Sequence, residues 1–320
     1  MRTTMSAMAA SILLALAASS THAESTATLT QSGTDNAAFI NQVDLGGRLN
    51  ARISQNGNFN RAGDPAAGSG GIEQIDIASD ASASIDQTGD SNNAGVRQVA
   101  SERVGGEITQ SGANNSARIL QDPVFRTGAA IEQTGTANIG RITQQDVGDF
   151  DARIVQNGSD NRADVVEIGT AFGWAHLLQE GTGNSIDVRQ TDSGFKLIDV
   201  TQQGNLNAVT AQQSVGQLDT IGITQEGNGN RASATQSGEA SDILINQHGN
   251  DNTALVTQSL LLNDAKVTQI GNGNQATINQ VGAVSGGAAG NVASISQTGD
   301  GFVASISQSG GAHTAHIVQH

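Results

Sequence analysis

Cysteine and tyrosine are absent from this 320-residue chain, and the other aromatic residues are few, with seven Phe and one Trp. The lack of cysteine excludes disulfides, thiolate catalysis and cysteine-based zinc sites. The lack of large side chains disfavours two ordinary globular domains, whose cores normally use them. Positive charge is also scarce: 15 Lys and Arg stand against 30 Asp and Glu, and the net charge of −15 disfavours nucleic acid as a partner.

Long apolar runs are missing except near the N-terminus, where "MAASILLALAASS" follows Met1 and Arg2. This run is shorter than the roughly 18 apolar residues that cross a bilayer. Small residues follow it at Thr21 and Ala23. We therefore expect residues 1–23 to be a secretory signal peptide, with a short membrane anchor as the alternative. Residues 24–320 are expected to be exported and soluble.

Glycine, in contrast, is abundant at 40 residues, and a repeat of 22–23 residues built on glutamine runs through the chain. Each repeat holds two glutamines about eleven residues apart. Position 167 carries Glu in place of the second glutamine, and an insertion displaces one partner to Gln74. The first glutamines are Gln31, Gln55, Gln87, Gln110, Gln133, Gln156, Gln179, Gln202, Gln225, Gln247, Gln269 and Gln297, and a last half-repeat ends at Gln319. The second glutamines are Gln42, Gln98, Gln121, Gln144, Gln190, Gln213, Gln236, Gln258, Gln280 and Gln308.

An aliphatic residue lies two positions before each first glutamine, and polar residues lie between, as around Ile53, Ile108 and Val200. Apolar residues at period two predict strands with one buried face. The sequence therefore predicts an all-β fold of about 12.5 stacked strand–turn–strand repeats across residues 24–320. Loop insertions are expected near residues 63–70 and 281–290.

Stacking one repeat on the next would place identical amides above one another and form hydrogen-bonded ladders. A buried amide without partners costs roughly 1–3 kcal/mol, which explains why these positions recur. The asparagines expected to join the ladders are Asn36, Asn60, Asn92, Asn115, Asn138, Asn161, Asn184, Asn207, Asn230, Asn252 and Asn274. The glycines expected at the turns are Gly33, Gly57, Gly89, Gly112, Gly135, Gly158, Gly181, Gly204, Gly227, Gly249, Gly271 and Gly299.

The frame S-x5-Q-x-G-x-x-N-x-A-x3-Q resembles the curlin repeats of bacterial curli fibre subunits. The first repeat fits it completely, with Ser25, Gln31, Gly33, Asn36, Ala38 and Gln42. The resemblance implies a flattened β-solenoid that is exported through the periplasm and a dedicated outer-membrane pore of a Gram-negative cell. It also implies amyloid, pilus-like fibres on the cell surface that support adhesion and biofilm, with a nucleator subunit as a partner.

The sequence favours a structural role: a secreted subunit that polymerises with copies of itself, head to tail, because no capping element is found at either end. The alternatives are a nucleator or minor subunit, and a monomeric exported β-solenoid adhesin. A polysaccharide-cleaving β-helix would need clustered acidic and basic side chains, and no repeat shows them. We predict no catalytic residues, metal or cofactor. Disorder, common in sequences rich in Gly, Ser, Asn and Gln, remains the alternative for the fold.

Some repeats depart from the frame. The leading Ser is replaced by Phe150, Gly173, Lys196 and Asp219 in consecutive repeats. Phe172 and Trp174 lie in the link before Gln179, where they would either make contacts between fibres or cover a turn.

Overall fold

The computed structural model describes residues 11–17, 25–44, 47–62, 71–282 and 290–320. The described residues form strands, turns and bends without a helix, and they divide into two compact units, Met1–Gln145 and Asp146–His320. None of them forms a helix that could cross a bilayer. The predicted insertion at 63–70, most of the one at 281–290 and most of the predicted signal peptide lie outside the described residues.

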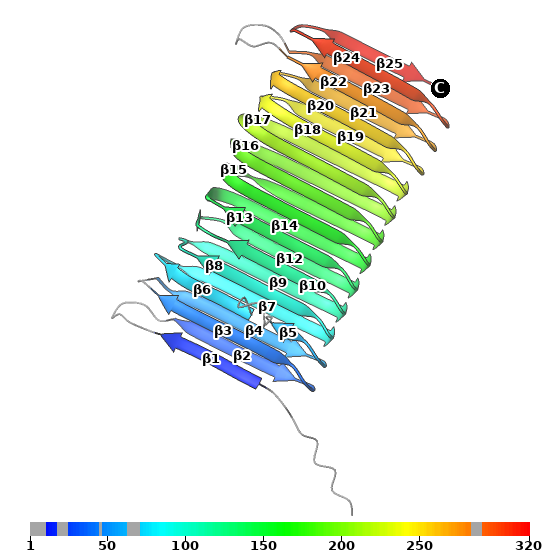
Figure 1. Ribbon diagram of the computed structural model, residues 1–320. Helices are drawn as coiled ribbons and strands as arrows, with labels where there is room; N and C mark the ends of the chain where they lie inside the picture. The colour runs from blue at the N-terminus through cyan, green and yellow to red at the C-terminus, as the bar shows by residue number, and fades with distance from the viewer. Residues whose placement is uncertain (1–10, 18–24, 45–46, 63–70, 283–289) are drawn as a thin grey trace, which may run out of the picture. The chain divides into compact units, whose positions relative to one another are not determined.

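Unit 1 is a β-solenoid in which each coil, meaning one circuit of the chain, supplies one strand to each of two sheets (Figure 1). One sheet is the parallel series β2–β4–β7–β9–β12 and the other is β1–β3–β6–β8–β10–β13. The strands are β1 (Ser11–Ala17), β2 (Thr26–Ser32), β3 (Ala37–Asp44), β4 (Leu49–Asn56), β5 (Arg61–Ala62), β6 (Gly71–Ile77), β7 (Ala81–Asp90), β8 (Asn93–Val99), β9 (Val104–Ala113), β10 (Ser116–Gln121), β11 (Val124–Phe125), β12 (Gly128–Thr136) and β13 (Ile139–Gln145).

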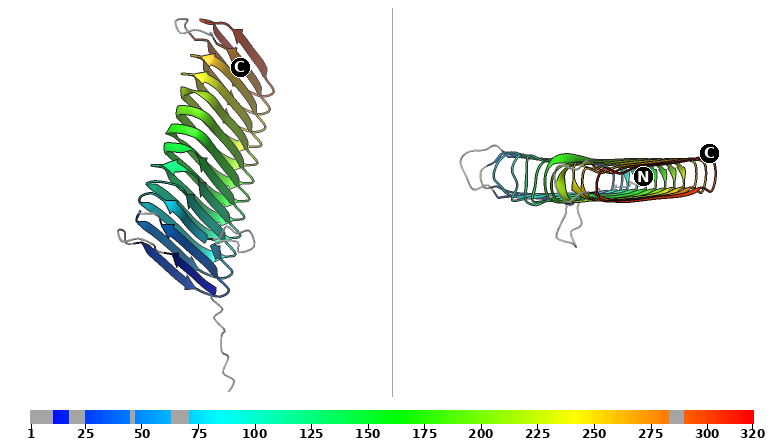
Figure 2. Two further views of the ribbon diagram at one scale, coloured as in Figure 1. Left: turned by 60° about the vertical axis from the view of Figure 1, so that its left-hand side comes forward. Right: turned by 90° about the horizontal axis from the view of Figure 1, so that it is seen from above.

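Unit 2 has the same design, and its coils appear in Figure 2 as flattened loops between two facing sheets. Its three longest strands each continue around an arc, so that one strand contributes to both sheets. The strands are β14 (Val147–Ser159), β15 (Arg162–Thr182), β16 (Ser185–Asn205), β17 (Ala208–Asn228), β18 (Arg231–Glu239), β19 (Asp242–His248), β20 (Thr253–Leu261), β21 (Asp264–Ile270), β22 (Gln275–Val281), β23 (Val292–Thr298), β24 (Val303–Ser309) and β25 (Thr314–Gln319).

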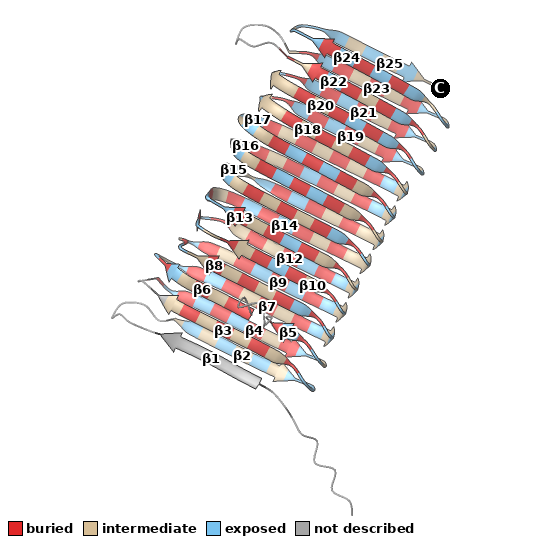
Figure 3. Ribbon diagram, in the orientation of Figure 1, coloured by how far each residue is buried: buried red, intermediate tan, exposed pale blue. Residues whose placement is uncertain are grey.

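Buried and exposed residues alternate along the strands of both units (Figure 3). The aliphatic residue two positions before each first glutamine is buried throughout β4 to β23; Ile53, Ile108 and Val200 are examples. Leu29 on β2 is only half-buried, because β2 pairs with β4 on one side alone among the described strands. The predicted all-β, β-solenoid fold is confirmed, with about 12 turns in the chain.

The pairing is parallel and in register because the repeat length equals one coil. In unit 2, for example, Gln179 lies opposite Gln202, and Gln202 lies opposite Gln225. Parallel, in-register stacking places identical side chains one strand spacing apart, about 4.8 Å. The polar residues of the core are therefore arranged as columns that run along the solenoid.

Candidate functional site

The predicted glutamines form two columns of buried amides in each unit. The first column of unit 1 runs from Gln31 through Gln55, Gln87 and Gln110 to Gln133, and the second from Gln42 through Gln74, Gln98 and Gln121 to Gln144. In unit 2 the first column joins Gln156, Gln179, Gln202, Gln225, Gln247, Gln269, Gln297 and Gln319. The second joins Gln190, Gln213, Gln236, Gln258, Gln280 and Gln308.

Every bond in these columns has the same direction. The Nε2 of each glutamine donates to the Oε1 of the glutamine one coil nearer the C-terminus, for instance Gln202 to Gln225 at 2.8 Å. Most Nε2 groups donate a second hydrogen bond to a backbone carbonyl oxygen, as Gln202 does to Ser185 at 3.2 Å. Each column therefore has an acceptor end toward the N-terminus and a donor end toward the C-terminus.

Replacing Gln202 with leucine is expected to destabilise unit 2, because it removes the amide between Gln179 and Gln225. Each partner left unpaired in the core costs roughly 1–3 kcal/mol. The loss should appear as a lower guanidinium midpoint, followed through the fluorescence of Trp174, the single tryptophan. Gln203→Leu on the exposed face is the control, with a change within about 0.5 kcal/mol. Equal effects for both variants would show that the column contributes no stability.

The asparagines form part of the expected side-chain ladder, for example from Asn92 Nδ2 to Asn60 Oδ1 and from Asn252 Nδ2 to Asn230 Oδ1, both at 3.1 Å. Most of their hydrogen bonds, however, go to the backbone. The Oδ1 of Asn184 accepts the backbone N–H of Asn207 at 3.0 Å. The Nδ2 of Asn184 donates to the carbonyl oxygen of Gly204 at 2.8 Å. The same two bonds recur at Asn60, Asn92, Asn207, Asn230 and Asn252. A shorter side chain than Gln reaches the arc backbone, so Asn holds consecutive arcs together.

All twelve turn glycines have a φ between +105° and +130°. At Gly204 an added Cβ would lie 2.0 Å from the carbonyl oxygen of Gly227 in the next coil. Only glycine permits this approach, since the backbone of one arc occupies the space that a side chain would need. The column of glycines therefore sets how closely consecutive arcs stack.

Glu167 lies at the N-terminal end of the second column of unit 2. It is fully buried and lies opposite Gln190 in the register. The Oε1 of Gln190 is buried without a hydrogen-bond partner, whereas its Nε2 donates to Gln213 at 2.9 Å. A glutamate side chain has no N–H to donate, which accounts for the unsatisfied acceptor of Gln190.

Replacing Glu167 with glutamine is therefore expected to stabilise unit 2 by roughly 1–3 kcal/mol, because an amide supplies the N–H that Gln190 lacks. Guanidinium unfolding of the variant and the parent chain measures the difference. Glu239→Gln, on the exposed face of β18, is the matched control and should change stability by less than about 0.5 kcal/mol. A destabilised Glu167→Gln variant would contradict this account of the column.

The structure shows a further amide row that was not predicted from the sequence. It lies on the surface of unit 2, three residues after each first glutamine, where Asn205, Asn228, Asn250 and Asn272 donate in turn along the row to Asp300. The recurring Gln-x-Gly-Asn of these repeats was its signal in the sequence. In this exposed row, as in the glutamine columns, each amide donates to the residue one coil nearer the C-terminus.

The structure also explains four departures from the leading Ser. Phe150 is buried, and its ring occupies the space that a side chain at Gly173 would need, since an added Cβ would lie 2.7 Å from the ring. In the next two coils Lys196 and Asp219 are both buried, with Nζ and Oδ2 3.5 Å apart. Asp219 also accepts the backbone N–H of Ser241 at 3.1 Å. A bulky residue is thus offset by glycine, and a cation by a carboxylate.

The described part of the chain holds no group of three or more His, Asp or Glu side chains that could bind a metal ion. A search of curated proteins found no match. Residues 219–249 match the family model of the curlin associated repeat, a repeat family that is structural rather than enzymatic. This segment spans Gln225, Asn230, Gln236 and Gln247, and coils on either side of it in unit 2 place the same residue types in the same columns. Residues 219–249 therefore carry a curlin associated repeat, which supports the resemblance seen in the sequence pattern.

Proposed function

We propose that this protein is the structural subunit of an extracellular, curli-like fibre, and that copies add to one another along the solenoid axis. The curlin associated repeat and the β-solenoid fold support a structural subunit. The single observation that carries the assembly proposal is the uniform direction of the glutamine columns. A column with an acceptor end and a donor end can be extended only by another column of the same direction.

The edge strands support this proposal. On β2 of unit 1, the buried Oε1 of Gln31 has no hydrogen-bond partner among the residues that the structure describes. On β25 of unit 2, the Nε2 of Gln319 donates to the backbone carbonyl of Val303 at 3.2 Å, and to no side chain in the described part of the chain. Within the described residues, β2 and β25 each pair with one strand. Edges with free backbone groups are templates for another chain. Acceptor and donor edges complement each other, whereas two acceptor edges do not, so the fibre would be polar.

The described part of the predicted signal peptide, β1, also lies at the N-terminal edge of unit 1. β1 pairs with β3, and the register sets Leu16 opposite Gln42, whose Oε1 has no hydrogen-bond partner. An apolar segment cannot continue the amide column. Cleavage after Ala23 would uncover β3, and assembly would then begin only after export. The proposal accordingly includes export through the periplasm and an outer-membrane pore, with a nucleator subunit as a further partner.

The test compares inward and outward substitutions on the same edge strands. Gln31→Glu and Gln319→Glu place a carboxylate in the column, whereas Thr30→Glu and Val318→Glu place it on the exposed face. Residues 24–320 of each variant are seeded with parent fibres, and elongation is followed by thioflavin fluorescence. The inward pair should slow elongation strongly and the outward pair weakly. The parent fibres should diffract at 4.7–4.8 Å along the fibre axis. A parent chain that stays monomeric for days at high concentration would overturn the proposal.

A further inference from the structure

The two sheets of the solenoid end at different points along the chain. We call the sheet that carries the first glutamines the first sheet, and the sheet that carries the second glutamines the second sheet. At the C-terminal edge of unit 2, β24 is the last described strand of the second sheet, and β25 follows it in the first sheet (Figure 1). Strands of the two sheets alternate along each coil, so the next strand of the coil would lie on β24.

The N-terminal edge of unit 1 does not supply that strand after the predicted cleavage. Residues 24–320 begin with β2 in the first sheet, and β3 in the second sheet follows. In the proposed fibre, β2 of one copy stacks on β25 of the copy before it. This contact continues the first column, because the Nε2 of Gln319 then faces the Oε1 of Gln31.

The second sheet does not close at the same joint. β24 lies half a coil before β25, and β3 lies half a coil after β2. In the fibre they are therefore two strand spacings apart, about 9.6 Å, with room for one more strand between them. We call this place the open strand position, defined by β24 of one copy and β3 of the next.

The side chains on both borders of the open strand position specify what fits it. Each border directs a small, an aliphatic and a glutamine side chain into the core: Ala304, Ile306 and Gln308 on β24, and Ala38, Ile40 and Gln42 on β3. The Nε2 of Gln308 donates to the backbone carbonyl of Val292 at 3.1 Å, and to no side chain among the described residues. The Oε1 of Gln42 is buried and has no hydrogen-bond partner in the described part of the chain. A donor and an acceptor of the second column thus face the same gap.

We propose that each joint binds one extended strand of a second polypeptide whose inward residues follow the pattern Ala-x-Ile/Val-x-Gln. The glutamine of this strand accepts a hydrogen bond from the Nε2 of Gln308 and donates one to the Oε1 of Gln42, in the direction that the second column already has. The backbone of the strand pairs with β24 and β3, as in other complexes formed by strand addition. This inference rests on the proposed head-to-tail fibre and names a partner for its joints.

Other ways to close the joint fit less well. β1, from the predicted signal peptide, sets Leu16 opposite Gln42, and an apolar side chain leaves both amides unpaired. In the described part of the chain, every strand is already paired within a sheet of its own copy, so a second copy has no strand to spare. Detachment of β25 would remove the mismatch, but it breaks the bond from Gln297 to Gln319 at 2.9 Å and the pairing of β25 with β23.

The test measures uptake of a peptide with the proposed pattern into growing fibres. Residues 24–320 elongate from parent seeds together with a fluorescently labelled peptide of residues 253–259, "TALVTQS", which directs Ala254, Val256 and Gln258 inward. We expect the washed fibres to retain about one peptide per subunit, because each joint has a single open strand position. Elongation should also be severalfold faster, because the peptide supplies backbone partners to both β24 and β3.

The same peptide with Gln258→Leu is the matched control, because leucine leaves Gln308 and Gln42 without partners at the joint. Its affinity for the fibres should be at least about tenfold lower. Each peptide alone, at the same concentration, provides the blank for sedimentation and for thioflavin fluorescence.

A variant of the chain closes the joint without any peptide. Residues 249–259 are repeated after His320, so that Gln319 and His320 lead into the same turn and strand that follow Gln247 and His248. This extended chain ends in a strand of the second sheet. Its fibres should elongate rapidly without peptide and retain none of it along their length. Circular dichroism and the guanidinium midpoint verify that the extended chain folds as the parent does.

Two results would overturn the inference and leave the fibre proposal intact. The first is fibres of residues 24–320 that grow equally fast with the peptide and retain it no better than its Gln258→Leu form. The second is equal peptide uptake by fibres of the parent and the extended chain, which would place the binding elsewhere on the fibre. If neither chain forms fibres under any of these conditions, the head-to-tail assembly itself is wrong, and this inference with it.

Discussion

Replacing Lys196 with methionine is expected to lower the free energy of unfolding of unit 2 by roughly 3–5 kcal/mol at neutral pH, because it leaves the Asp219 carboxylate buried without its cation. Both side chains are at most 1% exposed. Each charge therefore depends on the other. Guanidinium unfolding followed through Trp174 fluorescence measures the loss of stability in unit 2.

The double variant Lys196→Met/Asp219→Leu tests whether unit 2 needs the ion pair itself or only side chains that fill the same space. Apolar residues of similar volume often replace a buried ion pair without loss of stability. The double variant should therefore regain most of the stability that the single variant loses. As a control, Lys266→Met, at an exposed position of β21, should change stability by less than about 0.5 kcal/mol. A double variant as unstable as Lys196→Met would mean that the methionine itself does not fit the core.

The same pair predicts a dependence on pH. Burial raises the pKa of Asp219 from 3.8 to about 6, against the opposing effects of the Ser241 N–H and the Lys196 ammonium. Burial likewise lowers the pKa of Lys196, against the attraction of Asp219 and Asp192. Between pH 4 and 6 the folded chain keeps a proton on Asp219 that the unfolded chain has lost. The contribution of Asp219 to stability therefore falls as pH rises through this window.

Asp219→Asn removes this titration, so the difference in unfolding midpoint between parent and variant should change between pH 4 and 6 and be constant below pH 4. Unfolding curves at several pH values provide the measurement. A constant difference across the window would show that Asp219 is ionised in the folded chain throughout, and that the ammonium of Lys196 outweighs burial.

The second large effect is expected at the turn glycines. Gly204→Ala should destabilise unit 2 by several kcal/mol, because its Cβ would lie 2.0 Å from the carbonyl oxygen of Gly227, and neither backbone can move without parting the stacked arcs. Strain at an unfavourable φ alone costs about 1–3 kcal/mol, and here the clash adds to it. The guanidinium midpoint and the elongation rate on parent seeds should both fall.

Gly273→Ala provides the matched control for the clash. Gly273 also has a positive φ, +66°, but no atom lies within 4 Å of an added Cβ. Alanine there should cost only the left-handed backbone penalty, about 1–2 kcal/mol. If the two alanine variants lose the same stability, the close approach of consecutive arcs is not what requires glycine at Gly204.

The coil length and the choice of buried face could be read from the sequence because both depend on simple periods. Side chains alternate at period two along a strand, so Ile53 and Gln55 had to share one face. A repeat of 22–23 residues with near-identical halves fits one coil with two strands. The glutamine positions follow from the same periods, and the structure places them in columns as hydrogen-bonded neighbours.

Hydrogen-bond partners were harder to predict, because they depend on distances between consecutive coils. Asn and Gln carry the same amide and both recur in the sequence. Only the arc geometry shows that Asn184 reaches the backbone of Gly204 and Asn207, whereas Gln202 reaches another side chain. The direction of the columns is likewise a property of side-chain orientation, which no sequence period encodes.

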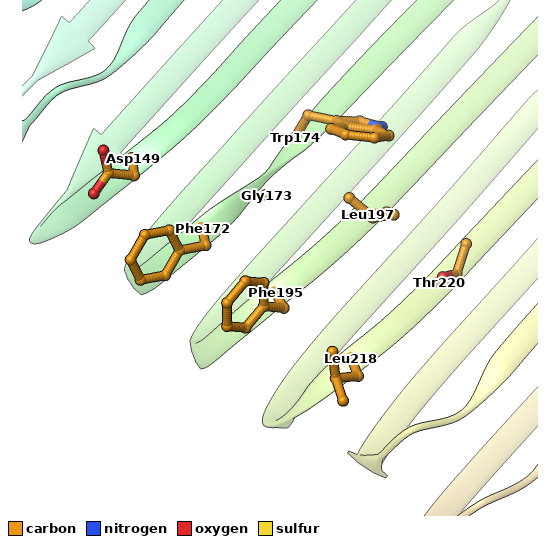
Figure 4. A pocket seen from close by; sticks show the side chains of 8 residues that line it. All are labelled: Asp149, Phe172, Gly173, Trp174, Phe195, Leu197, Leu218 and Thr220. Atoms are coloured by element: carbon orange, nitrogen blue, oxygen red, sulfur yellow. The ribbon is translucent and has the colours of Figure 1, made fainter.

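The repeat, the strand faces and the curlin resemblance could be derived from the amino-acid sequence alone, because they follow from spacing along one chain. The roles of the irregular positions became visible only in the folded chain. Lys196 and Asp219 are 23 residues apart, and Phe172 and Phe195 are as well, yet the first pair is buried and the second is an exposed pair of stacked rings (Figure 4). In an arc, the backbone angles of a residue decide whether its side chain points inward or outward, as the positive φ values of Phe172 and Phe195 illustrate. These backbone angles depend on how whole coils stack.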